Sequence, residues 1–244
     1  MNRFFVEKDK IMENKILITD KEDIKHMNNV LRLKPNDLIE VSDGEKYEYL
    51  AQIMKVSKAN VECNIIESSV FTREPLRKVY LYQGIPKQSK MEFIIQKCVE
   101  LGIYEVIPVF TERTVIQDKG NFPKKIERWQ KISEEAAKQS KRGIIPRVKD
   151  AMDFDNMLNN LNHVDLILFL YENEEKTSIK EVLRSWKKNE RIALIIGPEG
   201  GFSGEEAEKI IKLGAQSASL GKRILRTETA GAVALAITLY ELEG

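Results

Sequence analysis

A glycine-rich segment at residues 197–206, GPEGGFSGEE, stands directly after the apolar run RIALII at 191–196. Glycines allow a backbone to approach a ligand closely, and parallel sheets bind ligands at the carboxyl ends of their strands. The spacing matches neither the dinucleotide GxGxxG pattern nor a phosphate-binding loop, and Glu199 would repel a phosphate. The segment therefore predicts a site for a small molecule offering hydroxyls, an adenine edge or a cationic group, unless its glycines serve only tight strand-to-helix packing. Ser203 with Glu206 has the capping-box spacing and predicts where the next helix begins.

A second segment that could carry chemistry lies at residues 219–231, SLGKRILRTETAG. It places basic side chains and a glutamate between an apolar strand end and a helix start, which Thr227 or Thr229 could cap. Loops at one edge of a sheet would form one pocket together with the glycine-rich segment. The alternative is a mutual ion pair that only holds the loop, formed among Arg223, Arg226 and Glu228.

The charge of the chain is unevenly distributed, although 39 Lys and Arg nearly balance 38 Asp and Glu. Residues 71–150 carry a net charge of +7, whereas residues 1–70 carry −2 and residues 151–244 carry −4. A basic stretch in the middle therefore predicts a polyanion partner, unless it is a solvated helix face. Its basic residues are Arg113, Lys119, Lys124, Lys125, Arg128, Lys131, Lys138, Lys141, Arg142, Arg147 and Lys149.

Composition and spacing exclude several classes of protein. With 42% hydrophobic and 32% charged residues over 244 positions, the chain is typical of a globular protein of one large or two modest domains. Apolar runs such as 166–170 are far shorter than the roughly 18 residues of a membrane span, and the start MNRFFVEKDK has no signal-peptide core, which favours a cytoplasmic protein. Cys63 and Cys98 form no CxxC, and His26 and His163 have no nearby soft ligand, so neither a disulfide nor a metal centre is expected.

Residues 1–70 are typical of a small β-rich domain, followed by a linker at 71–77 that contains Pro75. The turn residues Ser42-Asp43-Gly44 separate two of its strands. One helix is expected over residues 23–31, with Asp20 or Thr19 as its cap and Pro35 as its stop. The expected strands are residues 3–6, 37–41, 47–54 and 61–66.

After residue 77, strands alternate with helices, which is typical of a mostly parallel sheet covered by helices. The runs 165–170 and 192–196 lack polar alternation, as strands buried on both faces do. The expected strands are residues 78–83, 105–110, 164–170 and 191–196. The expected helices are residues 91–101, 124–140, 153–161, 178–186, 204–213 and 229–242.

GPEGG at 197–201 followed by LGKRILRTETA at 220–230 resembles the knotted SPOUT methyltransferases, and most closely the RsmE family of 16S ribosomal RNA uridine N3-methyltransferases. The resemblance spans nearly the whole chain, and its motifs are specific together although each alone would be weak. Further similar blocks are QKCVELG at 96–102, TERT at 111–114, Arg128-Trp129, EAAKQSKR at 135–142 with Pro146, RFF at 3–5, and His26 with VLR at 30–32.

The resemblance implies an α/β domain at 78–244 with a parallel sheet and a deep trefoil knot in its last third, and a PUA-like β-barrel at 1–70 that binds RNA. It also implies a homodimer that binds S-adenosyl-L-methionine in a bent shape inside the knot and acts on ribosomal RNA or the small ribosomal subunit. Cofactor contacts, mostly through the backbone, are then expected at Leu170, Ile196, Gly197, Pro198, Glu199, Gly200, Gly201, Leu220, Gly221, Ile224, Leu225, Arg226, Thr229 and Ala230.

Methylation at uridine N3 requires the imide proton to leave and the nitrogen to approach the methyl carbon in line. Our hypothesis is that Arg226 or Arg113 stabilises the developing uridine anion and that Glu228 orients the arginine. His26 is expected to pack or to contact RNA. The alternatives are a 2′-O-ribose methyltransferase and a non-catalytic RNA-binding protein. RNA backbone contacts are expected from Arg3, Arg32, Arg113, Lys138, Arg142 and Arg147.

Overall fold

The computed structural model describes residues 1–116, 122–186 and 190–243, which form two compact units. Unit 1 comprises Met1–Glu74 and Ala137–Ile145, and unit 2 comprises residues 75–136 and 146–244. Unit 1 therefore takes in the first part of the expected linker and also a later segment of the chain.

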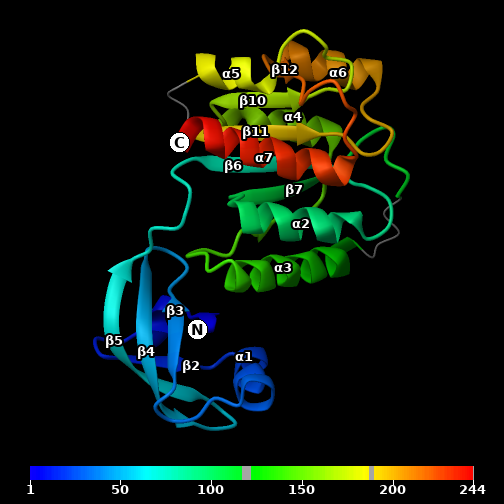
Figure 1. Ribbon diagram of the computed structural model, residues 1–244. Helices are drawn as coiled ribbons and strands as arrows, with labels where there is room; N and C mark the ends of the chain where they lie inside the picture. The colour runs from blue at the N-terminus through cyan, green and yellow to red at the C-terminus, as the bar shows by residue number, and fades with distance from the viewer. Residues whose placement is uncertain (117–121, 187–189, 244) are drawn as a thin grey trace. The chain divides into compact units, whose positions relative to one another are not determined.

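Unit 1 is built on a five-stranded sheet in the order β1-β3-β4-β5-β2 (Figure 1). β1 pairs with β3 in parallel, and the other neighbours are antiparallel. The strands are β1 (Arg3–Phe5), β2 (Lys15–Ile18), β3 (Leu38–Ser42), β4 (Tyr47–Val56) and β5 (Val61–Val70). The helical segments are the 3₁₀ turn η1 (Lys8–Lys10), α1 (Lys21–Lys25) and the π-helical turn η2 (His26–Leu31) that continues α1.

Alternate residues of these strands form the core of unit 1, because side chains of a strand alternate between its two faces. Ile39 and Val41 of β3 are fully buried, and Ile16 and Ile18 of β2 are 1% exposed. β2 is absent from the expected strands, since four residues carry little periodic signal, and its pairing with β5 is what buries it. The expected cap of the first helix is confirmed, because Asp20 accepts a hydrogen bond from a backbone N–H of α1.

Segment 137–145 belongs to unit 1 because polar groups hold it there. The guanidinium of Arg3 donates to the backbone carbonyls of Lys141 at 2.9 Å and of Arg142 at 2.7 Å. Such a return of the chain depends on contacts between residues far apart in sequence. Composition along the chain therefore predicts a linker at 71–77 but gives no sign of the returning segment.

Unit 2 contains a seven-stranded sheet in the order β12-β10-β11-β6-β7-β8, in which β9 also pairs with β7. All of these pairs are parallel, as the sequence predicts. Its strands are β6 (Lys78–Gly84), β7 (Glu105–Phe110), β8 (Arg147–Val148), β9 (Met152–Asp153), β10 (Leu166–Leu170), β11 (Arg191–Ile196) and β12 (Gln216–Ala218). Its helices are α2 (Lys90–Leu101), α3 (Phe122–Gln139), whose last turn lies in unit 1, α4 (Phe154–Asn160), the short η3 (Leu161–His163), α5 (Ile179–Ser185), α6 (Gly204–Lys212) and α7 (Thr227–Glu243).

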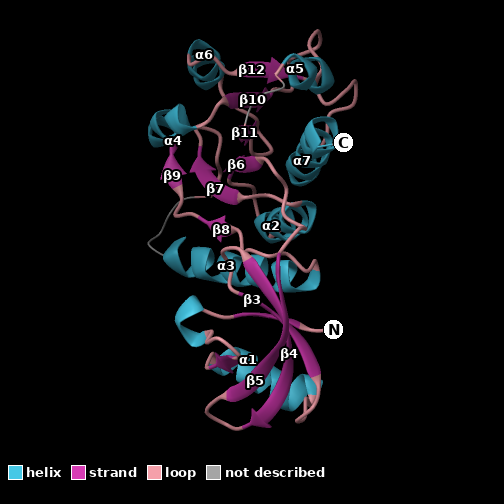
Figure 2. Cartoon of the chain, turned by 90° about the vertical axis from the view of Figure 1, so that its left-hand side faces the viewer, coloured by secondary structure: helices cyan, strands magenta, loops and turns pink. Residues whose placement is uncertain are grey.

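Helices cover both faces of this sheet: α2, α5 and α7 lie on one face, and α4 and α6 lie on the other (Figure 2). The long elements occur in the expected order, although α7 begins at Thr227 rather than at Thr229. β8, β9 and β12 are too short to be predicted from periodicity. Within the described residues, no helix is both long and apolar enough to cross a membrane.

Candidate functional site

The glycine-rich loop, residues 197–203, connects β11 to α6 in unit 2. Gly201 has a φ of +67°, a conformation that favours glycine, and its N–H donates to the Pro198 carbonyl at 2.9 Å. Ser203 N–H donates to Glu206 Oε2 at 3.0 Å, while Glu206 N–H donates to Ser203 Oγ at 3.3 Å. The predicted capping box is confirmed, and it holds the end of the loop on the first turn of α6.

A buried amide joins the glycine-rich loop to the start of α7. Gln83, at the carboxyl end of β6, is fully buried, and its Nε2 donates to Thr227 Oγ1 at 2.9 Å. Thr227 Oγ1 in turn donates to the Gly197 carbonyl at 2.6 Å. The two segments that stand out in the sequence therefore meet here. Gln83 is missing from the predicted site residues, and an amide closing the apolar strand β6 is the signal that could have indicated it.

Lys90, at the amino end of α2, links the same two segments by charge. Its Nζ lies 2.8 Å from Glu199 Oε1 and 3.5 Å from Glu228 Oε2, and the Lys87 N–H donates to the Glu199 carboxylate at 3.2 Å. Burial alone would raise the pKa of Glu199, but the hydrogen bonds from Lys90 and from the backbone outweigh it and lower this pKa. Glu228 thus pairs with Lys90, and no hydrogen bond or ion pair joins it to Arg226 among the described residues.

We expect the charge on Glu199 to stabilise the fold near neutral pH and to stop doing so in acid. The pKa of this group lies below 4.5 in the folded chain, so its contribution is complete above the unfolded value and is lost as pH falls through the folded value. Between about pH 6 and pH 3, the wild type should lose more unfolding free energy than Glu199→Gln, as measured by urea denaturation. The control is Glu205→Gln, at an exposed position of α6. Identical losses in wild type and Glu199→Gln would contradict the expectation.

Two exposed arginines flank the glycine-rich loop. Arg113 Nη1 donates to the Gly200 carbonyl at 2.9 Å, and a Cβ built on Gly200 would lie 3.2 Å from Arg113 Cβ. Arg226 directly precedes Thr227, and its side chain makes no ion pair within the described residues. The mutual ion pair of Arg223, Arg226 and Glu228, which spacing alone allows, is therefore not formed.

The other residues expected to contact a cofactor differ in their exposure to solvent. Leu170 is half-buried at the end of β10, and Ile196 is 2% exposed at the end of β11. Ile224 is 87% exposed, which leaves an apolar side chain open to solvent. Of the remainder, Pro198 is buried, Leu220, Leu225 and Ala230 are half-buried, and Gly221 and Thr229 are exposed.

Three of the predicted RNA contacts are engaged inside unit 1. Arg3 is 4% exposed and Arg142 is 3% exposed. Lys138 Nζ lies 2.7 Å from Asp23 Oδ1, and its side chain is 12% exposed. Removing one partner of a buried ion pair is strongly destabilising, and cations buried in this way are not placed to meet a phosphate backbone. A structural role explains these three residues.

The other predicted RNA contacts are accessible. Arg32 is exposed in unit 1, and Arg113 and Arg147 are exposed in unit 2. His26 is also exposed, so it remains available for the RNA contact that was one of its two expected roles. Lys119 of the basic stretch lies outside the described residues.

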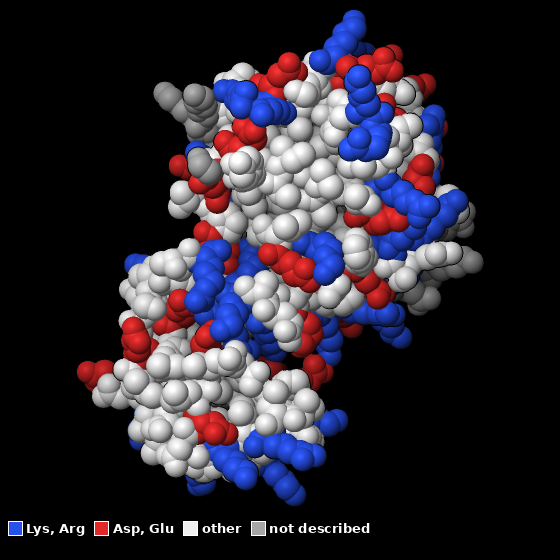
Figure 3. All heavy atoms as spheres, viewed as in Figure 1, with Lys and Arg blue, Asp and Glu red and all other residues white. Residues whose placement is uncertain are grey.

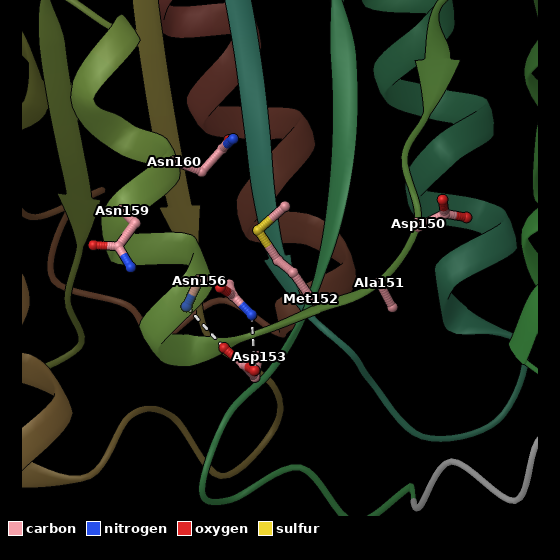
Figure 4. A pocket seen from close by; sticks show the side chains of 7 residues that line it. All are labelled: Asp150, Ala151, Met152, Asp153, Asn156, Asn159 and Asn160. Atoms are coloured by element: carbon pink, nitrogen blue, oxygen red, sulfur yellow. Dashed lines mark hydrogen bonds between the residues drawn. The ribbon is translucent and has the colours of Figure 1, made fainter.

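A polar hollow of about 540 Å³ lies elsewhere in unit 2, between residues 150–153 and the exposed side of α4 (Figure 4). Its side chains bond among themselves, as in the 2.9 Å hydrogen bond from Asn156 Nδ2 to Asp153 Oδ2. None of its lining residues is a predicted site residue, so the loop cluster is the candidate site. Among the described residues, no three His, Cys, Asp or Glu side chains are grouped to hold a metal ion.

The chain matches two protein families in succession. Residues 18–66 match the RNA methyltransferase PUA domain, and residues 72–239 match the RNA methyltransferase domain. The five-stranded unit and the parallel α/β unit with its glycine-rich loop thus define an RNA methyltransferase with a PUA-type domain.

Individual relatives show which family of RNA methyltransferases the chain resembles. The Ribosomal RNA small subunit methyltransferase E of Bacillus subtilis is 36% identical over 100% of the chain and 98% of the relative. A solved structure of methyltransferase E from Neisseria gonorrhoeae, bound to S-adenosyl methionine, has a TM-score of 0.87 at 29% identity over 99% of this chain and 98% of that one. A Legionella pneumophila methyltransferase in complex with the same cofactor has a TM-score of 0.86 at 32% identity over 98% and 96%. The chain belongs to the ribosomal RNA small subunit methyltransferase E family, which confirms the resemblance seen in the sequence.

Proposed function

We propose that this protein transfers a methyl group from S-adenosyl-L-methionine to N3 of a uridine in small-subunit (16S) ribosomal RNA. The observation that carries the proposal is the meeting of the glycine-rich loop with the start of α7 through Gln83 and Thr227. This contact between the two segments occurs in a member of a family named for methyl transfer to small-subunit ribosomal RNA. Two solved relatives hold the cofactor.

The groups around the loop fit this cofactor. A Cβ built on Gly197 would lie 3.1 Å from Gly201 Cα, so the loop offers backbone rather than side chains to a ligand. The carboxylates of Glu172 and Glu199 beside it disfavour a phosphate but suit hydroxyls, an amino group and a positive charge. We expect the cofactor to be held by three segments: the loop, the end of β10 at Leu170, and residues 220–230. When bound, the cofactor supplies a methyl group on a positively charged sulfur.

The protein's own contribution is to position uridine and to stabilise its charge. Loss of the N3 proton leaves negative charge on N3 and the two neighbouring carbonyl oxygens, and a guanidinium placed there stabilises it. Arg226 or Arg113 would supply this group. Because Glu228 pairs with Lys90, we propose that this pair fixes the start of α7 and positions Arg226 through the backbone rather than by direct contact.

RNA phosphates would be bound by the exposed arginines, namely Arg32, Arg113 and Arg147. Contacts of this kind hold the RNA without reading its sequence. Sequence choice would then depend on an unpaired base presented to the site, as is usual for proteins that recognise RNA.

RNA affinity should fall steeply as salt rises, because cations that bind phosphates release counterions. In a filter-binding titration of 16S ribosomal RNA, Arg147→Ala should reduce the slope of log affinity against log salt by about 0.7 to 0.9. The matched control is Lys212→Ala, which removes an exposed cation of α6. A slope that Arg147→Ala leaves unchanged would exclude this residue from the interface.

Three architectural features also belong to the proposal. A knot in the last third is supported by the path of the chain after β12, since Ser219 N–H donates to the Thr177 carbonyl at 2.8 Å before Thr227 reaches Gly197. Homodimerisation is supported by α7, which has no charged residue between Glu228 and Glu241. In the part of Figure 3 where Figure 1 places α7, the surface is free of charged atoms. Closure of the five-stranded sheet into a barrel is supported by the match to the PUA domain family. Apart from these three features, the ribosomal RNA substrate of the family supports a cytoplasmic location.

The deciding experiment is mass spectrometry of 16S ribosomal RNA nucleosides from cells with and without the gene. Loss of 3-methyluridine, restored by the wild-type gene, is the expected result. A lost methyl group on ribose instead of the base would refute the assignment to N3. Unchanged nucleosides would refute the methyltransferase activity and favour an RNA-binding protein without catalysis.

A further inference from the structure

We propose that Glu172 binds the cofactor by accepting hydrogen bonds from the adjacent hydroxyls of its ribose, an inference that rests on the proposed function. Glu172 lies in the turn that follows β10, just beyond Leu170. β10 and β11 are neighbouring parallel strands. The turn therefore lies at the carboxyl edge of the sheet, beside the glycine-rich loop, where parallel sheets bind ligands.

The Glu172 carboxylate lies directly against the glycine-rich loop. A Cβ built on Gly201 would overlap Oε1 of Glu172 and would lie 3.0 Å from its Cδ. The carboxylate can occupy this position because Gly201, at a φ of +67°, has no Cβ. The carboxylate thus packs against the backbone of the glycine-rich loop at Gly201.

Three carboxylates near the loop are already engaged. Glu199 and Glu228 pair with Lys90, and Glu206 closes the capping box of α6. Glu172 is exposed, and within the described residues its carboxylate has no hydrogen bond or ion pair with the protein. Unlike those three carboxylates, it is therefore free to bind a ligand.

An ionised carboxylate only accepts hydrogen bonds, and its two oxygens can take one donor each. The 2′ and 3′ hydroxyls of a ribose are two donors on adjacent carbons, and in dinucleotide folds an acidic side chain binds the ribose 2′ hydroxyl. Hydrogen bonds to a charged group contribute more than neutral ones. The α-ammonium of the cofactor is the other donor that could reach a carboxylate, so the experiment must separate the two.

The test is calorimetric titration of wild type and Glu172→Gln with three probes. S-adenosylhomocysteine carries both the ribose and the ammonium, its 2′-deoxy analogue lacks one hydroxyl, and 5′-methylthioadenosine lacks the ammonium. Glu172→Gln should weaken the first and third probes alike, by roughly tenfold or more. Removal of the 2′ hydroxyl should weaken binding to wild type but change binding to the variant little.

The matched control is Glu175→Gln, which removes an exposed charge from the same connection between β10 and α5. It should bind all three probes as the wild type does, and both variants should keep the wild-type thermal midpoint. Equal binding by Glu172→Gln and wild type would overturn the inference. A loss seen with S-adenosylhomocysteine but not with 5′-methylthioadenosine would assign Glu172 to the ammonium and overturn the ribose contact. A wild type that binds none of the probes would overturn the proposed function itself.

Discussion

Arg226→Ala is expected to lower the rate constant of uridine methylation by roughly a hundredfold or more, while the cofactor dissociation constant changes less than about threefold. The physical reason is that a positioned cation acts on charge that exists only as the N3 proton leaves, so its loss raises the barrier without weakening cofactor binding. The Arg226 side chain has no ion pair among the described residues, so its removal breaks none of the ion pairs that hold the fold. Single-turnover methyl transfer to 16S ribosomal RNA and calorimetric cofactor binding measure the two quantities.

Two further variants make this result specific. Arg223→Ala removes an exposed cation from the same segment and should leave both quantities near the wild-type values. Arg113→Ala tests the other candidate, whose guanidinium bonds the Gly200 carbonyl. If Arg226→Ala weakens cofactor binding as much as it slows methyl transfer, Arg226 is a binding residue and its catalytic role is refuted.

Arg142→Met is expected to lower the free energy of unfolding of unit 1 by about 3 to 5 kcal/mol. Arg142 is 3% exposed, and its Nη2 lies 2.5 Å from Glu74 Oε2. Glu74 also accepts from the N–H of Gly143 at 2.8 Å, so this carboxylate binds two consecutive residues of segment 137–145. Removing the guanidinium would leave a carboxylate that is 14% exposed without its counter-charge. Hydrogen exchange of the β3–β5 amides, followed by mass spectrometry, measures the loss.

The neighbouring residue supplies the control. Lys141 also pairs with a glutamate, Glu40, at 2.8 Å, but its side chain is 40% exposed. Lys141→Met should therefore cost less than about 1 kcal/mol, because water screens the pair. The double variant Arg142→Met with Glu74→Gln should recover part of the loss, since the uncompensated charge is gone. Equal effects of Arg142→Met and Lys141→Met would show that the Arg142 ion pair is not a main support of unit 1.

Long elements with strong periodicity could be predicted from the sequence. β11 and α6 illustrate this, because an uninterrupted apolar run is typical of a strand buried on both faces and the Ser203–Glu206 spacing indicates a helix start. β2, β8 and β12 could not be predicted in the same way, since two to four residues contain at most two periods of any pattern. Their pairing depends on a neighbouring strand that already exists.

The candidate site, too, could be predicted from the sequence only in part. The glycine-rich loop and the segment before α7 were evident as chemistry-bearing stretches, and family resemblance connected them to one cofactor. The pairing of Glu228 with Lys90 rather than with Arg226 was not evident, nor was the amide of Gln83 that joins the two segments. In each case the partner comes from β6 or α2, more than a hundred residues earlier.

By itself, the sequence determined the family, the order of the long elements and the place of the glycine-rich turn, because these depend on local pattern. Only the tertiary structure decided which charges are available. It buried Arg3 and Arg142 inside unit 1, engaged Glu199 and Glu228 with Lys90, and left Glu172 exposed against Gly201. The physical reason is that a charged side chain takes its role from the groups the fold brings within a few ångströms, and sequence spacing does not specify those groups.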